Sequence, residues 1–298
     1  MKISVVILNW NRPLDTVAAA ESVLRQTYAD VEVLLWDNAS TDDSLAVLER
    51  RFAGEPRVRL VPGDANYGVA GGRNRAFPLT SGDIIFSLDS DAVIEGNDGL
   101  TIIANTFARS PEAGAISFEV KRPDGHLMWP FSRPSETWRR RGFETYRVDG
   151  CAFATRREIF NAAGGFAEHF SPYGAEDAHY AFKVIGLGHS VLYVPEVVVV
   201  HAFSPAGRNA TQFKMHVRNR LLIPLELFPM PHALASYLKS ALSLARDAAE
   251  QRALGSFAAG AGRSLADFRM NNRHGMGRDG WRRFRNLVAE EKKLAPRG

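Results

Sequence analysis

The stretch IIFSLDSDAVI, Ile84–Ile94, joins an apolar run typical of a buried strand to two aspartates one residue apart, Asp89 and Asp91. An ionised carboxylate is costly beside an apolar interior unless water or positive charge compensates it. The pattern therefore predicts a strand end that opens onto water or a cation. In extended geometry both side chains point to one side, where a divalent cation could bridge them to phosphate oxygens. A solvated turn is the alternative, and the pair of aspartates alone favours it.

The first 90 residues alternate between strand-like and helix-like patterns. Segments with helical spacing separate the apolar runs ISVVIL, VEVLLW, VRLV and DIIFSL, which predicts a parallel sheet covered by helices. Pro13 suits the first position of one helix, and Ser40 or Thr41 could cap the next. Ligands of such sheets sit outside the carboxyl ends of the strands, and NWNR, DNAS and DSDA all fall there.

Beyond residue 112 the pattern changes. Residues 121–146 are rich in Pro, Arg and aromatic residues without periodicity, which predicts a long loop over one end of the sheet. A strand, helix and glycine turn follow in GCAFATRREIFNAAGGF, then a helix in AEDAHYAFKVIGLG and a strand in HSVLYVPEVVVVH. After His201 the chain is predicted to be helical to its end.

Composition narrows the class of protein. The 298 residues are 45% hydrophobic and 23% charged, as in a globular protein, and the longest apolar run is broken by Pro195 and Glu196, so no membrane-spanning segment is predicted. The first residues resemble a strand and not a signal peptide. The lone Cys151 excludes an internal disulfide and is expected to be a buried, inert thiol.

Three further clusters carry candidate chemistry. Asp37 ends the second predicted strand, where an acidic residue can accept ribose hydroxyls or a base N–H, although an ordinary cap is equally consistent. In NYGVAGGRNRA a glycine-rich turn leads into a helix whose first turns are predicted to hold Arg73 and Arg75, an arrangement suited to a diphosphate. It has neither dinucleotide nor P-loop spacing.

The segment GAEDAHY places Glu176 and Asp177 at a helix start, where the helix dipole favours an ionised carboxylate and hence a general base. Helix capping is the more frequent role of acidic residues there. His201 ends a β-rich run and could ligate a metal through a neutral imidazole, although a lone histidine is more often structural.

The order of these motifs is more specific than any one of them. VVILNWNR, DNASTDDS, NYGVAGGRNRA, LDSDA, GCAF…GGF and YGAEDAHY, followed by a later histidine, closely resemble the inverting, nucleotide-sugar-dependent family 2 glycosyltransferases of bacterial type. The resemblance covers about residues 1–201. It implies the α/β GT-A fold, with a Rossmann-like mixed sheet flanked by helices and a helical C-terminal extension.

The resemblance also implies roles for individual residues. Asp91, Asp89 and His201 would hold Mg²⁺ or Mn²⁺, and Asp177 would deprotonate the acceptor hydroxyl with Glu176 positioning it. His179 departs from many relatives, which carry an acidic residue there, and this concerns acceptor recognition. The residues implied to bind the nucleotide sugar are Leu8, Asn9, Trp10, Arg12, Asp37, Asn66, Gly68, Arg73 and Asp89.

The implied reaction moves a sugar from a UDP-, dTDP- or GDP-sugar to an acceptor hydroxyl with inversion, the acceptor being a glycan, a lipid-linked molecule or a small molecule. Cell-envelope or exported polysaccharide synthesis is the expected setting. The expected domains are residues 1–205, with a nucleotide-sugar half of about 1–110 and an acceptor half of about 111–205, and a basic extension of 206–298. No nucleic acid partner is expected, and a monomer and a homodimer both stay open.

Two other functions compete with this one. A nucleotidyltransferase also uses paired aspartates and a metal, but it should carry an N-terminal glycine-rich basic loop, and ILNWNRPLD has none. A non-catalytic sugar or nucleic-acid binder would suit the basic tail, but it leaves the clustered carboxylates unexplained. Hydrolysis of a nucleotide sugar with added metal separates the three.

The tail is the one region that the resemblance does not reach. Residues 202–298 hold 17 Lys and Arg against 7 Asp and Glu, whereas residues 1–201 hold 20 against 26. Leu234, Leu238, Leu242 and Leu244 are predicted to lie near one helical face, which usually packs on its own domain. The basic excess suits an anionic membrane surface, so we expect a cytoplasmic enzyme that contacts the inner face of the membrane.

Overall fold

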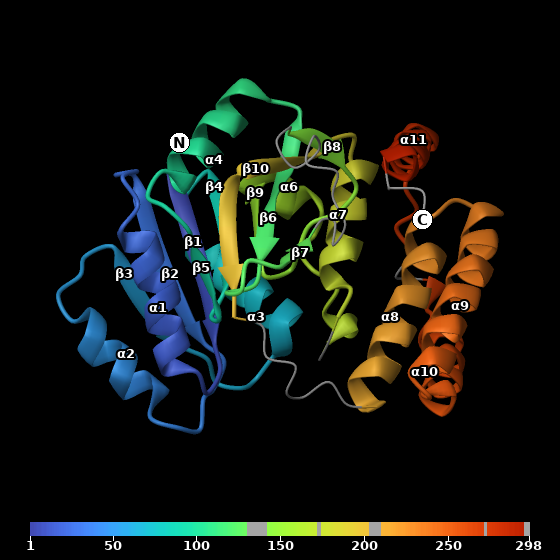
Figure 1. The fold of residues 1–298 in the computed structure, drawn as a ribbon, viewed down its shortest axis with the longest axis horizontal. Coiled ribbons are helices and arrows are strands. Elements are labelled where there is room, and N and C mark those ends of the chain that lie inside the picture. Colours follow the sequence, from blue (N-terminus) through green and yellow to red (C-terminus); the bar gives the residue numbers. More distant parts are fainter. Residues whose placement is uncertain (130–141, 172–173, 203–209, 271–272, 295–298) are drawn as a thin grey trace.

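The computed structural model describes residues 1–129, 142–171, 174–202, 210–270 and 273–294. Figure 1 shows a curled sheet with helices on both faces and a group of helices from the C-terminal third at one side. The sheet runs in the order β3-β2-β1-β4-β9-β6-β10-β5, with β7 paired to β6 and β8 to β10. Its strands are β1 (Ile3–Asn9), β2 (Val31–Asp37), β3 (Val58–Pro62), β4 (Ile84–Asp89), β5 (Ala92–Ile94), β6 (Ala113–Lys121), β7 (Leu127–Trp129), β8 (Phe143–Thr145), β9 (Ala152–Arg156) and β10 (Ser190–His201).

The helices confirm the predicted alternation. Pro13 opens the first of them, where a missing backbone N–H costs nothing. They are α1 (Pro13–Leu24), α2 (Ser44–Phe52), α3 (Gly68–Ala76), α4 (Gly99–Arg109), α6 (Arg157–Ala162), α7 (Glu176–Gly186), α8 (Ala210–Leu227), α9 (His232–Glu250), α10 (Leu254–Asp267) and α11 (Arg278–Leu294), with short 3₁₀ turns η1 (Phe77–Leu79) and η2 (Glu168–Phe170).

Strand alternation divides the core into two layers. In β1, Ile3, Val5 and Ile7 pack against α1, α2 and α4, while Val6 faces the opposite layer with α3, α6 and α7. Because successive side chains of a strand point to opposite faces, one apolar strand serves both layers. Strands β1, β2, β3 and β4 are parallel, which brings their carboxyl ends to one edge of the sheet.

The second half of the sheet is mixed. β9 runs antiparallel between β4 and β6, and β10 runs parallel to β6. The predicted loop over residues 121–146 is wrong at its flanks, because Leu127–Trp129 and Phe143–Thr145 pair with β6 and β10 as short strands. Residues 130–141 of that prediction lie outside the described residues.

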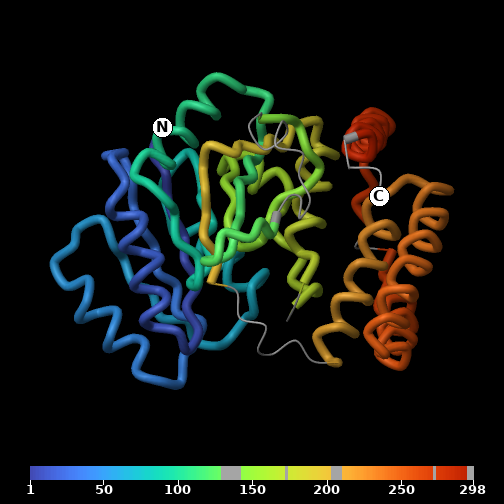
Figure 2. Tube along the Cα trace, in the orientation of Figure 1, coloured from blue at the N-terminus to red at the C-terminus, as the bar shows by residue number. Residues whose placement is uncertain are grey.

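The C-terminal helices are packed onto the sheet-bearing part of the chain. Leu222, Ile223 and Leu227 of α8 and Phe284 and Leu287 of α11 belong to the same core layer as α7. A smaller core joins α8, α9 and α10 around Val217, Leu221, Tyr237 and Leu244. The tube in Figure 2 shows these helices beside α7, on the side away from β1, β2 and β3. The predicted domain boundary at residue 205 stays a prediction, but the two regions share apolar packing.

Leu244 corrects one expectation about the tail. It is buried in the smaller core, whereas Leu234, Leu238 and Leu242 are 52%, 56% and 66% exposed. Positions four apart share a helical face, and Leu244 lies only two residues beyond Leu242. The prediction of one face with four leucines is therefore wrong. Three of the leucines form an exposed stripe on α9.

Candidate active site

Two aspartates and a histidine meet at the carboxyl edge of the sheet. Asp89 is the last residue of β4, Asp91 follows after one residue, and His201 ends β10, where it pairs with Ala92. One ligand atom from each of the three side chains lies within 4.8 Å of the other two. His201 Nε2 is 3.2 Å from Asp91 Oδ1. Carboxylate oxygens with one imidazole nitrogen are a donor set suited to a divalent cation.

Two arginines compensate part of this negative charge. Arg12 Nη1 lies 2.6 Å from Asp91. Arg73 is 1% exposed, and its guanidinium lies 3.0 Å from Asp89 and 3.5 Å from Glu176. Arg73 therefore links the carboxylate pair at the end of β4 to the acidic start of α7.

The environment separates the pKa values of these carboxyl groups. Burial, partly offset by Arg73, raises the pKa of Asp89 to about 6. Burial acts the same way on Asp91, but the hydrogen bond and charge of His201 outweigh it and lower the pKa of Asp91. Burial opposes protonation of His201, yet Asp91 and Asp89 raise its pKa above the usual value. A nearby cation would therefore favour the fully ionised carboxylates.

The acidic pair at the start of α7 is confirmed at the predicted position. Asp177 Oδ1 accepts the Ala178 N–H at 2.7 Å, and its Oδ2 accepts the Gly150 N–H at 3.1 Å. Burial first, and then the charge of Glu176, raise the pKa of Asp177 to about 7. A carboxyl group with a pKa near neutrality is suited to take a proton from a hydroxyl group.

The turn Asp149–Cys151 connects the acidic start of α7 to Arg73 and Asp89. This turn was not predicted from the sequence. The Gly150 N–H donates to Asp177, and the Gly150 carbonyl accepts a hydrogen bond from Arg73. The Cys151 carbonyl accepts the Asp89 N–H at 2.7 Å. The Asp149 side chain accepts a hydrogen bond from the Cys151 N–H at 2.9 Å. The Cys151 thiol is buried and burial raises its pKa, as expected for an inert cysteine.

The ends of β1 and β2 are tied to each other. Asn9 is fully buried and donates to Asp37 Oδ1 at 2.6 Å, and Ser40 donates to both oxygens of Asp37. Trp10, by contrast, is 53% exposed. Ser40 thus bonds Asp37 instead of capping a helix. Helix α2 begins at Ser44, whose N–H donates to the Asp42 side chain, so the predicted cap at Ser40 or Thr41 is wrong. The predicted nucleotide contacts of Asn9, Asp37 and the partly buried Leu8 stay predictions.

Asn38, which was not predicted, organises the neighbouring loop. Its amide nitrogen donates to Asn66 Oδ1 at 3.0 Å and to the Gly68 carbonyl at 3.1 Å, and its oxygen accepts the Tyr67 N–H. Gly68 has φ +67°, a conformation that favours glycine. The DNAS motif contained the signal, since an asparagine beside a strand end has both donors and acceptors for a loop.

Helix α3 corrects the prediction for Arg73 and Arg75. The helix begins at Gly68, so both arginines lie in its last turn and not in its first. Arg75 stacks on Tyr67, with 3.5 Å from the guanidinium carbon to the ring centroid, and pairs with Glu168 at 3.1 Å. Only Arg73 of the two reaches the carboxyl edge.

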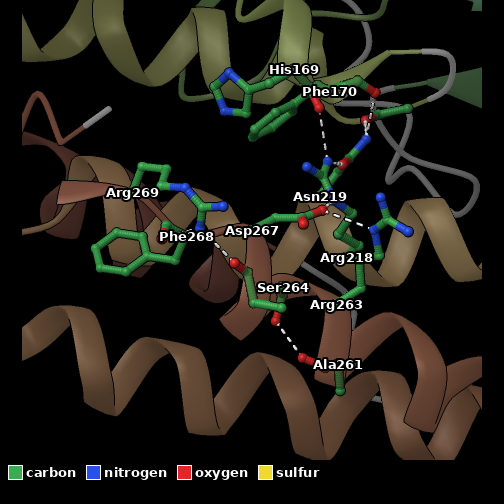
Figure 3. Close-up of polar contacts among 12 residues, drawn as sticks. His169, Phe170, Arg218, Asn219, Ala261, Arg263, Ser264, Asp267, Phe268 and Arg269 are labelled. Carbon is green, nitrogen blue, oxygen red and sulfur yellow. Dashed lines mark hydrogen bonds and ion pairs between the residues drawn. The ribbon is translucent and has the colours of Figure 1, made fainter. Parts of the chain in front are cut away.

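Helix α8 fixes the chain that leads into α7 (Figure 3). Arg218 pairs with Asp267 of α10 at 2.6 Å and donates to the His169 carbonyl at 2.8 Å. Its neighbour Asn219 donates to the carbonyls of Phe170 and Gly174 at 2.7 and 2.8 Å. Gly174 lies two residues before α7, so these bonds position the segment that presents the acidic pair.

A second buried contact joins the same helices. Glu226 of α8 is completely buried and accepts from His169 at 2.9 Å, while His179 Nε2 of α7 lies 3.3 Å from its other oxygen. His179 is 2% exposed and packs on the Phe170 ring. The residue that departs from the acidic family pattern thus faces a carboxylate from the C-terminal helices.

A cleft of about 770 Å³ extends from the carboxyl edge to the C-terminal helices. Its lining includes Asp89, Asp91, Asp149, Glu176, Asp177 and His201 on the sheet side, and residues of α8, α9 and α11 on the other. This volume is ordinary for a small-molecule site. Both regions of the chain therefore build the walls of one cleft.

Comparison with known proteins agrees with this geometry. Residues 4–164 match the model of glycosyl transferase family 2, and the chain belongs to that family. It is 39% identical over 143 residues to a chondroitin synthase of Escherichia coli, covering 45% of this chain and 21% of that protein. It is 26% identical over 203 residues to the O-antigen chain rhamnosyltransferase WbaN of Salmonella anatum, covering 63% and 62%. The chain spans about a third or less of the length of several curated relatives.

Solved structures confirm the GT-A fold. The mannosyltransferase PcManGT of Pyrobaculum calidifontis, in complex with GDP-Man and Mn²⁺, superposes with a TM-score of 0.64 at 23% identity over 99% of this chain and 80% of that one. Residues 1–349 of TarS from S. aureus, in complex with UDP-GlcNAc, give 0.64 at 17% identity over 100% and 93%. The family match confirms the predicted family and enzyme class, a glycosyltransferase, and the solved structures confirm the predicted fold.

Proposed function

We propose that the protein transfers a sugar from a nucleotide-diphosphate donor to an acceptor hydroxyl with inversion, assisted by Mg²⁺ or Mn²⁺. The observation that carries this proposal is the placement of Asp177 across the turn at Gly150 from the cluster of Asp89, Asp91 and His201. One group of ligands and one basic carboxylate therefore line the same cleft. The proposal rests on this geometry together with family membership.

The residues present fit a divalent cation. Five carboxylates line the sheet side of the cleft, and Arg12, Arg73 and His201 are their cationic partners among the described residues. Asp89, Asp91 and His201 would hold the ion, which supplies positive charge for the departing nucleotide diphosphate. The imidazole in this set is a reason to expect Mn²⁺ to bind at least as well as Mg²⁺.

The chain's own residues then carry the proton chemistry. Asp177 accepts the acceptor proton as the acceptor oxygen attacks the anomeric carbon, and the bond from that carbon to the diphosphate oxygen breaks. The Gly150 and Ala178 N–H groups fix the orientation of the carboxylate. Attack from the face opposite the leaving group inverts the configuration. Glu176 stays paired with Arg73 and positions the start of α7.

The relatives and solved neighbours support a proposal for the donor and the acceptor. The solved neighbours hold GDP-Man and UDP-GlcNAc, so a nucleotide sugar is the proposed donor. Relatives named for polysaccharide and O-antigen synthesis favour a glycan or lipid-linked acceptor in envelope biosynthesis.

The test is a panel of UDP-, dTDP- and GDP-sugars incubated with the protein and Mn²⁺. We expect one donor to be hydrolysed slowly without acceptor, and its nucleoside diphosphate to raise the thermal unfolding temperature only with metal. A nucleotidyltransferase would instead release pyrophosphate from a nucleoside triphosphate and a sugar phosphate. Hydrolysis that persists undiminished in EDTA would remove the metal from the scheme.

We also propose that α9 contacts an anionic membrane surface at the inner face of the cell membrane. Leu234, Leu238 and Leu242 form an exposed apolar stripe. Arg246, four residues after Leu242 on the same helix, and Arg252, two residues beyond the helix end, are exposed as well. Apolar insertion with flanking basic charge suits anionic lipid headgroups. None of the helices that the structure describes has the length and apolarity to cross a bilayer.

Vesicle sedimentation tests this contact. The full chain should bind vesicles rich in phosphatidylglycerol, less at high salt, and should not bind phosphatidylcholine vesicles. A Leu238→Ser, Leu242→Ser variant should lose binding. If the variant instead converts a dimer to a monomer while the wild type ignores vesicles, the stripe is a homodimer interface and the membrane contact is rejected.

A further inference from the structure

The cleft continues well beyond the groups that the proposed chemistry uses. Its far wall is a polar stripe on α8, formed by Gln212, His216 and Arg220 at intervals of four residues. Residues four apart lie on one helical face, so this whole face of α8 is turned into the cleft. On α9, Ser236, Lys239 and Ser240 line the same wall. These side chains are rich in hydrogen-bond donors.

Charge is distributed unequally along the cleft. Among the described lining residues, the carboxylates all belong to the sheet side: Asp89, Asp91, Asp149, Glu176 and Asp177. Arg220 and Lys239 come from the opposite wall. Within the part of the chain that the structure describes, neither of these two cations lies within ion-pair distance of a carboxylate. Arg147, which also lines the cleft, is already paired with Glu291 at 3.3 Å.

Lys239 has a like-charged neighbour as well. Lys292 of α11 lies close enough that the proximity and charge of Lys239 lower the pKa of Lys292. Two ammonium groups held near each other repel unless an anion lies between or beside them. The basic wall is therefore a place where a bound anionic group would relieve an existing repulsion.

We propose that the wall formed by Arg220 and Lys239 binds an anionic group, phosphate or carboxylate, carried by the acceptor. This inference rests on the proposed function, because it assigns the cleft beyond Asp177 to the acceptor. An anion on the acceptor would be repelled by the carboxylates of the sheet side and attracted to the opposite wall. This repulsion and this attraction together orient the acceptor. Its neutral hydroxyl group faces Asp177, while its charged group lies at α8 and α9.

The proposal also explains the use of the C-terminal helices. A neutral sugar could be held by hydroxyl and amide groups alone, and would not require two cations without carboxylate partners. An anionic acceptor, by contrast, gains from charge-assisted hydrogen bonds with both side chains. The sheet thus supplies the donor side, and the helical extension sets the class of acceptor.

The test uses two matched pairs of probes and the full chain saturated with its nucleoside diphosphate and Mn²⁺, so that the donor site is already filled. The carboxylate pair is p-nitrophenyl glucuronide against p-nitrophenyl glucoside, and the phosphate pair is glucose 6-phosphate against glucose. Binding is measured by calorimetry at low and high salt. We expect the anionic member of at least one pair to bind about tenfold tighter than its neutral partner, with a smaller ratio at high salt.

Variants locate the effect. Arg220→Gln combined with Lys239→Gln should remove the preference for the anion, whereas Arg220→Lys with Lys239→Arg should keep most of it. Arg50→Gln, an exposed residue of α2 outside the cleft lining, is the matched control and should behave as the wild type. All of these side chains are exposed, so folding should survive, and circular dichroism checks it.

The outcomes are decisive in both directions. The pair that shows the preference tells a phosphate-bearing acceptor from a carboxylate-bearing one. Equal binding within both pairs, including undetectable binding of all four probes, would overturn the inference, as would a preference that the double glutamine variant retains. Nucleotide binding by the wild type, which is measured first, tests the proposed function separately.

Discussion

The carboxyl edge of the sheet and the C-terminal helices contribute to the same cleft in different ways. At the edge, Asp89 and Asp91 come from a short motif at a strand end that can be recognised in the sequence, and the lone His201 joins them from the end of β10. In the helices, the contributions have no motif: Arg218 and Asn219 of α8 fix the approach to α7, and Glu226 of the same helix meets His179.

The difference separates the residues that react, at the sheet edge, from the residues that hold them in place, in the helices. Reacting groups need particular side chains at particular backbone positions, so they leave a local pattern. Supporting contacts need only complementary partners from elements distant in sequence, so they appear only in the folded chain. If this division is right, changes at the edge should affect turnover, and changes in the helices should affect stability and acceptor binding.

The largest expected effect is at Asp177. Asp177→Asn keeps size and shape but removes the base, so turnover should fall by roughly a hundredfold or more while donor affinity changes little. Steady-state kinetics and nucleotide binding measure the two quantities. Asp15→Asn, an exposed aspartate of α1, is the control and should be silent. Normal turnover of the Asp177 variant would place the base elsewhere.

Glu226 tests the supporting side of the comparison. Glu226→Ala removes a buried carboxylate from two histidine partners and leaves a cavity, so the free energy of unfolding should fall by about 3 kcal/mol. Glu226→Gln keeps the shape and should lose less. Urea unfolding measures both. Loss of turnover without loss of stability would show that this contact belongs to the chemistry after all.

The pH dependence of activity tests the role of the carboxyl groups at the sheet edge. Asp177, with a pKa of about 7, must be ionised to accept a proton, and Asp89, with a pKa of about 6, must be ionised to hold metal. Both pKa values lie above the ordinary value, so activity should rise with pH through this range. It should fall about tenfold per unit between pH 7 and pH 6 and by up to about a hundredfold per unit below pH 6, where both groups are protonated. An acidic limb near pH 4 would show that neither group controls the rate.

His201→Ala should have a smaller effect. Removing one of three ligands should weaken the affinity for Mn²⁺ in the presence of nucleotide by about tenfold, with Asp89 and Asp91 still in place. A calorimetric titration measures it, and excess Mn²⁺ should restore turnover. If the titration is unchanged, His201 supports Asp91 only by its hydrogen bond.

Exposed leucines of α9 should matter least to the fold. Leu238→Ser should change the free energy of unfolding by no more than about 0.5 kcal/mol, because the side chain is 56% exposed. Leu244→Ser, buried in the small core between α8 and α9, is the contrasting change and should cost several times more. Equal losses would mean that the stripe is covered in solution.

Much of the fold could be predicted from local patterns, and the exceptions have physical causes. Strand ends and the α7 start were correct because alternation, Pro13 and the acidic pair act over a few residues. The cap of α2 was wrong because Ser40 serves Asp37, a partner set by pairing of β1 with β2. The position of Arg73 within α3 was wrong because the helix starts earlier, at Gly68.

The candidate site shows the same limit. Asp89, Asp91, Glu176 and Asp177 were predicted because each lies in a recognisable motif. Asp149 and Asn38 were not predicted, because the Asp149 N–H bonds Ser117 of β6 and the Asn38 amide bonds the loop at Asn66, both distant in the sequence. The basic wall at Arg220 and Lys239 could not be predicted either, because a charge count cannot tell which side chains of a helix face a cleft.

The central claim is that donor binding depends on a metal held by Asp89, Asp91 and His201. Its most direct test is calorimetric binding of the selected nucleoside diphosphate to the wild type, Asp177→Asn and Asp91→Ala, each with Mn²⁺ and with EDTA. We predict binding to the wild type and to Asp177→Asn with Mn²⁺ only, and no binding to Asp91→Ala in either condition. Tight binding to the wild type in EDTA, or to Asp91→Ala with Mn²⁺, would contradict the account.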